Sequence, residues 1–168
     1  MEPTAALHSF HCPRWAELPS IPLYMDQVMI VLEDAIGLFA DGEEKVLTST
    51  MINNYVKQKL LDPPAKKKYS RQHLAVLIII TLLKKTLSMA EMAGLLQVLF
   101  EAYGIEKTYD MFCAHLEQSL TQTFAEDQSL SVSDATCKGV DSVLHAAMMA
   151  LMGKLYLQQF LGKYSQTK

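Results

Sequence analysis

Apolar residues recur at three- and four-residue spacing along most of the chain, which is the pattern of amphipathic helices. Short hydroxyl side chains and glycines mark where these helices begin and end. The predicted helices cover residues 26–40, 49–59, 70–85, 88–103 and 106–124, and a last, longest helix includes Val140–Tyr156. The sequence therefore predicts an all-α fold.

The start of the chain departs from this pattern. Four prolines lie within the first 22 residues, and each removes a backbone donor and fixes φ, so a long helix is excluded there. Phe10, Trp15, Leu18 and Ile21 lie among them, and we expect an irregular arm that buries these side chains against the folded body. The chain then divides into this arm (1–24), a helical core (25–104) and a C-terminal helical bundle or hairpin (105–168), joined in one continuous fold.

The predicted helix over 70–85 is apolar on nearly every side, which indicates burial on more than one side. Its triplet Ile78-Ile79-Ile80 would also suit a buried strand. Ser70 as an N-cap and the length of the segment favour a helix.

Positive charge is concentrated in one segment of an otherwise acidic protein. From Thr48 to Ala90 the segment charge is +7, whereas the remaining residues carry −10, within a total of −3. Basic side chains on one surface gain affinity for DNA by releasing counterions from the phosphates. The alternative is a solvated face of a helical domain, because local basic runs often serve only solubility.

This segment holds the candidate DNA-binding residues. Asn side chains pair with adenine edges, and hydroxyl groups bond phosphates. On the predicted recognition helix and its N-cap these groups are Thr48, Ser49, Thr50, Asn53, Asn54 and Lys57. In the basic turn that follows they are Lys66, Lys67, Lys68, Tyr69 and Arg71.

The order of short motifs strengthens the DNA-binding interpretation. Ile52-Asn53-Asn54-Tyr55, Leu60-Leu61, Pro63-Pro64, Lys68-Tyr69-Ser70, Ile78-Ile79-Ile80 and Leu87-Ser88-Met89-Ala90-Glu91-Met92 follow one another between Leu47 and Leu96. This run resembles the DNA-binding half of MerR-family transcription regulators. The whole chain also resembles an uncharacterised bacterial family of all-helical domains. The resemblance implies a MerR-like helix-turn-helix with a degenerate winged-helix core.

The chain departs from the MerR pattern at the positions that would touch DNA. Lys59 stands where that pattern has Gly, and Asn53 and Asn54 stand where it has Arg and Tyr. The wing is cut to about seven residues. Some domains of this kind have lost DNA binding and act in protein contacts, so a non-catalytic interaction module is the alternative function.

Other chemistry has little support in the sequence. His8-x-x-His11-Cys12 supplies three soft ligands, whereas a structural zinc site needs four, so we expect no metal. Motifs for phosphate, dinucleotide or nucleophilic chemistry are missing, so we expect neither an enzyme nor a cofactor. Met148, Met149 and Met152 suit a helix core, or else an adaptable apolar pocket. Helices after Glu106 could hold a small apolar effector.

The expected setting is a reducing cytoplasm. The chain has three cysteines, Cys12, Cys113 and Cys137. Their odd number and wide spacing argue against a disulfide framework. The longest apolar run, Leu74–Leu83, is too short for a bilayer, which needs about 20 residues, so we expect no membrane contact. The expected partners are double-stranded DNA and a second copy, bound as a homodimer through the C-terminal helices.

Overall fold

The computed structural model describes the backbone of residues 3–40, 45–124 and 138–166, and the side chains of residues 5–40, 45–124 and 138–162. Its elements are α1 (Pro3–His8), η1 (Trp15–Glu17), α2 (Met25–Ile36), η2 (Gly37–Phe39), α3 (Ser49–Lys57), α4 (Arg71–Leu83), α5 (Met89–Thr123) and α6 (Val140–Gln166). Within these described ranges, extended backbone pairs only at two isolated bridges, Leu23 with Tyr69 and Ala65 with Lys68. The predicted all-α class is confirmed.

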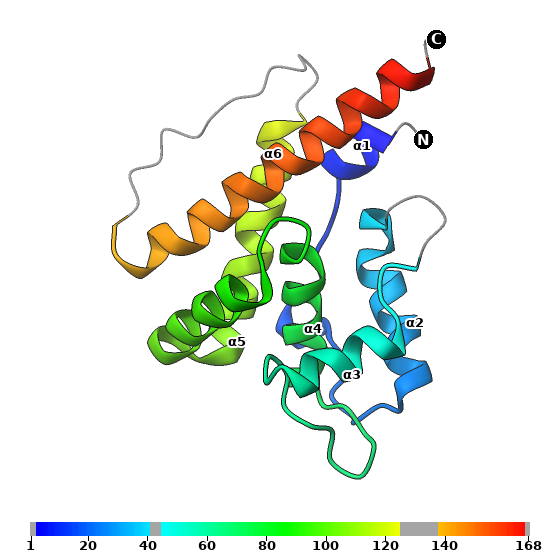
Figure 1. Ribbon diagram of the computed structural model, residues 1–168, viewed down its shortest axis with the longest axis vertical. Coiled ribbons are helices and arrows are strands. Elements are labelled where there is room, and N and C mark those ends of the chain that lie inside the picture. The colour runs from blue at the N-terminus through cyan, green and yellow to red at the C-terminus, as the bar shows by residue number, and fades with distance from the viewer. Residues whose placement is uncertain (1–2, 41–44, 125–137, 167–168) are drawn as a thin grey trace.

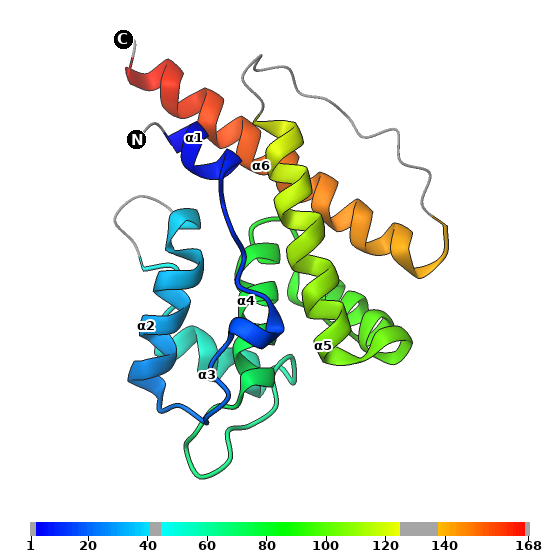
Figure 2. The same ribbon diagram turned by 180° about the vertical axis from the view of Figure 1, so that it is seen from behind.

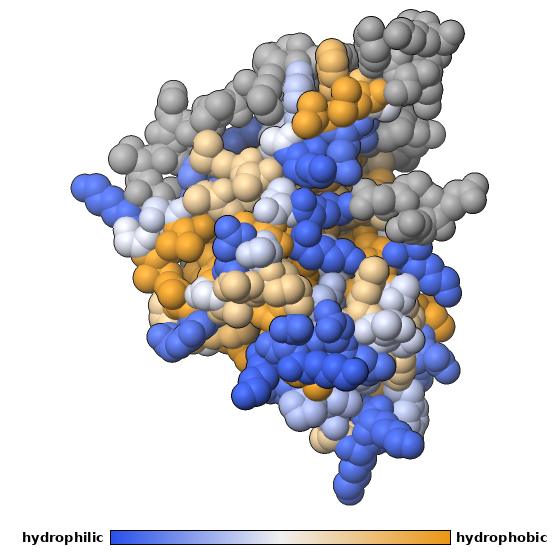
Figure 3. Space-filling view, viewed as in Figure 1, coloured by the Kyte–Doolittle hydropathy of each residue, from blue (hydrophilic) through white to orange (hydrophobic). Residues whose placement is uncertain are grey.

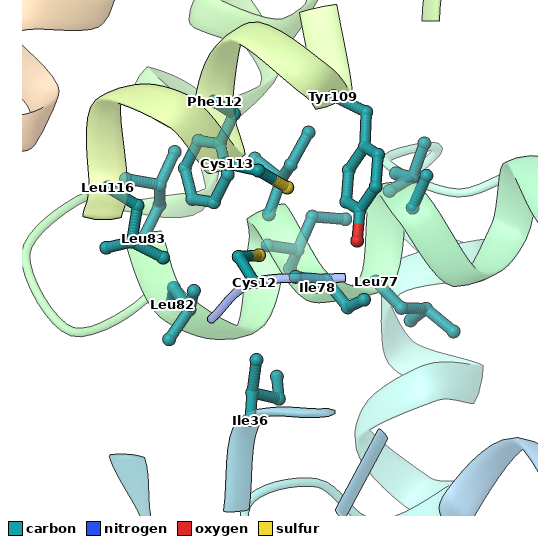
Figure 4. Close-up of a cluster of buried hydrophobic side chains, with 14 of the residues drawn as sticks. Cys12, Ile36, Leu77, Ile78, Leu82, Leu83, Tyr109, Phe112, Cys113 and Leu116 are labelled. Atoms are coloured by element: carbon teal, nitrogen blue, oxygen red, sulfur yellow. The ribbon is translucent and has the colours of Figure 1, made fainter. Parts of the chain in front are cut away.

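Helix α4 lies at the centre of the molecule. Every residue from Leu74 to Leu83 is buried, as the apolar residues on nearly every side of this helix predict. Figures 1 and 2 show α2 on one side of α4 and α5 on the other, with α3 crossing near its N-terminal end. Figure 4 shows side chains of α4 meeting those of α5 and the N-terminal arm in the core. Residues of α3, α4, α5 and the arm therefore belong to one shared core.

The element α5 consists of two helices that meet at a kink. The sequence predicts two helices on either side of Gly104, and this glycine has a non-helical backbone, with a φ of 75° and a ψ of 168°, so the prediction is confirmed. Such a conformation is accessible to glycine and strained for other residues. The Thr108 hydroxyl donates across the bend to the Leu99 carbonyl at 3.1 Å, so this backbone acceptor keeps a partner.

The N-terminal arm is more ordered than the prolines suggest. Helix α1 begins at Pro3, because proline has the φ that the first helical position requires and its missing N–H is not needed there. Leu18 is buried, and Phe10 and Trp15 pack half-buried against the core, as predicted. Ile21 is 67% exposed, so the expectation that it is buried is wrong.

Helix α6 packs on α5 through one of its two apolar faces. Leu144, Met148, Leu151 and Leu155 are buried, and Figure 1 shows α6 crossing the second half of α5. By length and composition, residues Val140–Gly162 of α6 could also cross a membrane. Of the 18-residue stretch within them that meets this criterion, 33% is buried inside the protein.

Candidate nucleic-acid interface

Helix α3 is held by its cap and by its inner face. The Thr48 hydroxyl accepts a hydrogen bond from the Met51 N–H at 3.3 Å, which satisfies one of the free donors of the first turn. Ile52 and Tyr55 point into the core and are 0% and 4% exposed. A nine-residue helix is marginal alone, so this docking fixes its orientation.

The outer face of α3 carries most of the predicted recognition residues. Ser49, Thr50, Asn53, Asn54 and Lys57 are all exposed. Because successive helical residues are rotated by about 100°, these five positions fall on one side of the helix, opposite the buried pair. Thr48 is half-buried and its hydroxyl accepts the capping hydrogen bond, so Thr48 does not belong to this exposed face. We call the five exposed residues the α3 outer face.

Lys59 ends α3 in a conformation that glycine usually adopts. Its φ is 59°, its N–H donates to the Val56 carbonyl at 3.1 Å, and the Leu60 N–H donates to the Tyr55 carbonyl at 3.0 Å. These two bonds are those of a Schellman motif. The side chains at the two positions that usually pack together in this motif, Tyr55 and Leu60, are both buried. Lys59 therefore ends α3 in the way that a glycine usually ends a helix.

The predicted basic turn is a tight reversal. Lys68 N–H donates to the Ala65 carbonyl at 2.9 Å, and Lys66 and Lys67 between them have φ values of 50° and 62°. Two consecutive positive φ values are the requirement of a type I′ turn, where Asn and Gly are the usual residues. Figure 3 shows hydrophilic side chains gathered over α3 and at the tip of this loop, on the same side of the molecule. We call residues 65–68 the lysine turn.

The other three predicted residues anchor the lysine turn. The ammonium of Lys68 lies 4.8 Å from the centre of the Tyr24 ring. Tyr69 is 3% exposed, and its backbone exchanges hydrogen bonds with Leu23 at 2.8 and 2.9 Å. The Arg71 guanidinium lies 5.8 Å from the Trp15 ring centre.

Tyr69 is therefore buried, which contradicts its predicted availability for contact with DNA. Burial raises the pKa of its phenol, and its ring packs edge-on to His73 at 5.5 Å. Its position in the core follows from the bridge to Leu23, which turns the side chain inward. The sequence indicates that the arm is buried, but it does not show that the arm holds the base of the lysine turn.

The connection from α2 to α3 is longer than a helix-turn-helix connection. It runs over residues 37–48 and contains η2, whereas that motif uses a turn of three or four residues. The sequence predicts that the first helix runs to residue 40, whereas α2 ends at Ile36 and η2 follows over Gly37–Phe39. Val46 is buried, and its carbonyl accepts from the Lys84 ammonium at 3.1 Å. Lys84 therefore ties this connection to the C-terminal end of α4.

The arm and α5 form an ion-pair cluster that the sequence does not reveal. Arg14 donates to both carboxylate oxygens of Glu117, at 2.9 and 2.6 Å, and the Cys12 N–H donates to the same carboxylate at 2.8 Å. Burial alone would raise the pKa of Glu117, but these hydrogen bonds and the Arg14 charge hold it below its usual range. His11, once a candidate ligand, lies between Glu17 and Glu117 at 3.0 Å from each.

The remaining candidates belong to the core. Cys12 and Cys113 are buried with their sulfur atoms near each other (Figure 4), and the hydrogen bond between them together with burial raises the pKa of Cys12. In the described ranges no group of three or more His, Cys, Asp or Glu side chains could hold a metal ion. Met148 and Met152 are buried core residues, whereas Met149 is 44% exposed.

Comparison with known proteins gives a family match. Residues 13–112 match the family described as Domain of unknown function (DUF1836). The matched region runs from the arm through α2, α3, the lysine turn and α4 to the middle of α5, and it leaves α6 outside. No curated protein and no solved structure matches the chain.

Proposed function

This chain belongs to the DUF1836 family, and we propose that it is a DNA-binding transcriptional regulator of MerR-like type. The α3 outer face enters the major groove, and the lysine turn contacts phosphates beside it. Asn53 and Asn54 supply the amide groups that suit adenine edges, and Lys57 adds charge on the same side.

The observation that carries the proposal is the conformation of the lysine turn. A non-glycine residue with positive φ costs roughly 1–2 kcal/mol, and the turn places two exposed lysines in this region. Backbone energetics alone would favour Gly or Asn there. Strain of this kind is found where the side chain is needed for function, and a positive charge at an exposed tip is suited to phosphate.

The test uses a double substitution that removes charge without weakening the fold. In the variant Lys66→Gly/Lys67→Gly the turn loses two charges and its backbone strain. We expect unchanged or higher stability, weaker binding to a pool of genomic duplex fragments, and a salt slope reduced by about 2, since each phosphate contact contributes about 0.9. Fluorescence anisotropy over a series of salt concentrations measures both quantities.

A matched control removes the same charge elsewhere. Lys107 and Lys154 are exposed on α5 and α6, neither belongs to the α3 outer face or the lysine turn, and their double alanine variant should keep the wild-type salt slope. Equal binding of all three proteins would refute the role of the lysine turn. A wild-type protein that retards no duplex at low salt would leave the alternative function, a non-catalytic protein-interaction module. The long connection between α2 and α3 is the structural feature that favours this alternative.

The proposed regulator is a homodimer through α6. On its outer side, Val143, Ala146, Ala150, Gly153, Leu157 and Phe160 are all exposed and spaced alternately by three and four residues. This spacing is that of a two-helix seam.

An antiparallel second copy would fit this seam. Phe160 then lies opposite Val143, Leu157 opposite Ala146, and Gly153 opposite Ala150, so each larger side chain faces a smaller one. A symmetric pair of this kind is self-complementary, which a twofold dimer requires. Two copies would also present two α3 helices to the two half-sites of one operator.

The dimer has its own test. Leu157→Asp should give a monomer in analytical ultracentrifugation. Ile30→Asp, at a position on α2 that is 70% exposed, should leave the dimer intact. A monomeric wild-type protein would refute the pairing, and so would partition of the protein into lipid vesicles through α6.

A further inference from the structure

Two cysteines that are far apart in the sequence meet where the N-terminal arm crosses α5. Cys12 lies in the arm, and Cys113 lies in the second half of α5, about 100 positions later. Figure 4 shows their sulfur atoms near each other inside the core, and a hydrogen bond joins the two thiols. The sequence argues against a disulfide framework, whereas the structure brings these two thiols into contact.

Neighbouring turns of α5 fix the backbone of the arm at this point. The Tyr109 hydroxyl donates to the Pro13 carbonyl at 2.6 Å, and the Cys12 N–H donates to the Glu117 carboxylate at 2.8 Å. Cys113 lies between these two anchors on the same face of α5, because residues four apart are neighbours on a helix surface. Its thiol lies 3.7 Å from the Pro13 carbonyl oxygen. The two thiols are therefore held opposite each other by contacts on both sides.

A disulfide at this position would need only a small movement of the side chains. The sulfur atoms of a disulfide are about 2.05 Å apart, so two thiols in contact must approach by roughly 1–2 Å. Buried cysteines are often ordinary core residues, and each then packs against apolar neighbours. Here each thiol faces the other, on two segments that a bond would join across a long loop. Such a bond restricts the unfolded chain and so favours the folded protein.

We propose that Cys12 and Cys113 form a reversible redox pair, whose disulfide fixes the arm to α5. The oxidant is a low-molecular-weight disulfide such as oxidised glutathione. The thiolate of one cysteine attacks it, forms a mixed disulfide and releases one glutathione thiolate. The thiolate of the other cysteine then attacks the protein sulfur of the mixed disulfide, so the Cys12–Cys113 bond forms and the second glutathione leaves. The protein gives up two electrons and two protons, and two molecules of reduced glutathione are formed.

The exchange begins before the arm has docked on α5. In the folded protein both thiols are buried, and their hydrogen bond together with burial raises the pKa of Cys12, so the folded protein presents no reactive thiolate there. During folding both thiols are accessible, and docking of the arm then brings the mixed disulfide to the remaining cysteine. The inference does not rest on DNA binding, and its test contains no DNA.

The test measures how strongly folding favours this disulfide. The Cys137→Ser variant, which leaves one possible intramolecular pair, is refolded from urea in buffers that differ in the ratio of oxidised to reduced glutathione. Acid quenching, alkylation and mass spectrometry give the fraction of disulfide, and hence the effective concentration of one thiol at the other. The same measurement in concentrated urea gives the value for the unfolded chain. We expect folding to raise the effective concentration at least roughly 100-fold, since the entropy of closing a loop of this length corresponds to a factor on the order of 1,000.

Two controls separate a specific pair from chance proximity. Adding Cys113→Ala and Ala114→Cys to the same variant moves the thiol by one position, to an exposed site with nearly the same loop length. Folding should not raise the effective concentration of this shifted thiol. Peptide mapping of the refolded wild type, in which Cys137 competes, should find the Cys12–Cys113 pair. An effective concentration in the folded protein at or below that in urea, an equal rise for the shifted thiol, or pairing with Cys137 would each overturn the proposal.

Discussion

Glu117 holds the N-terminal arm, and its replacement by Gln should release part of that hold. One carboxylate oxygen accepts from the Cys12 N–H and from Arg14 Nη1, and the other accepts from Arg14 Nη2. Gln keeps one acceptor, but its NH₂ group then faces a donor of Arg14. The variant therefore loses at least one hydrogen bond between charged groups.

The magnitude follows from these contacts. Hydrogen bonds to charged groups contribute about 1.5–3 kcal/mol, and partial exposure of the pair to solvent (31% for Arg14 and 24% for Glu117) lowers this value. We expect Glu117→Gln to reduce the free energy of unfolding by about 2 kcal/mol. For a chain of this size that corresponds to a fall in Tm of roughly 4–8 °C.

The protein carries its own reporter for this change. Trp15 is the single tryptophan and lies in the arm. Its backbone N–H donates to the Asp110 carboxylate at 2.8 Å. Urea unfolding followed by tryptophan fluorescence and by circular dichroism compares the arm with the helices. Glu106→Gln, at an exposed position of the same helix, is the control. An unchanged midpoint for Glu117→Gln would refute this account of how the arm is held.

The pH dependence gives an independent check. The pKa of Glu117 in the folded protein lies below its usual value of 4.5, so the unfolded chain binds its proton more tightly. The stabilisation is therefore complete above pH 4.5 and is lost as the pH falls through the folded pKa. The difference in stability between wild type and Glu117→Gln should shrink over that acidic range.

Three further predictions follow from single contacts. Lys59→Gly should raise the free energy of unfolding by about 1 kcal/mol in urea titrations, because it removes the strain of a positive φ, whereas Lys59→Ala should not. Thr81→Val should raise the free energy of unfolding by about 1 kcal/mol, because the Thr81 hydroxyl is buried without a hydrogen-bond partner among the described residues, and a loss of stability would show that the hydroxyl has one. In a Cys137→Ser background, Cys12 and Cys113 should resist a thiol reagent until the protein unfolds, because both are buried and the pKa of Cys12 is raised; fast labelling of the native protein would contradict this.

The helices could be predicted from sequence because each is set by local features. The break at Gly104, the cap at Thr48 and the apolar surround of α4 are determined by residues close in the chain. The buried side of α6 is likewise visible as a stripe at helical spacing. Periodicity also indicates which side of α3 is exposed, and the five residues of the α3 outer face are found together as expected.

The arm contacts could not be predicted because they join residues far apart in the chain, 103 positions for Arg14 and Glu117 and 46 positions for Leu23 and Tyr69. Nothing near Arg14 in the sequence indicates Glu117 as its partner, and nothing near Tyr69 indicates Leu23. The bridge between Leu23 and Tyr69 decides that the tyrosine faces the core. The error on Tyr69 therefore comes from a tertiary contact that overrides its place in a basic segment.

Three lysines have positive φ values, and two of them lie in the proposed DNA-binding surface. Lys66 and Lys67 form the tip of the lysine turn, whereas Lys59 ends α3. At each position the backbone favours glycine, and at the turn a bound phosphate favours the ammonium group, so the two requirements conflict there. If DNA binding explains the conflict, Lys66→Gly/Lys67→Gly gains stability and loses binding to duplex DNA. If this variant gains stability and binds duplex DNA as wild type does, the strain of the turn has no function in DNA binding.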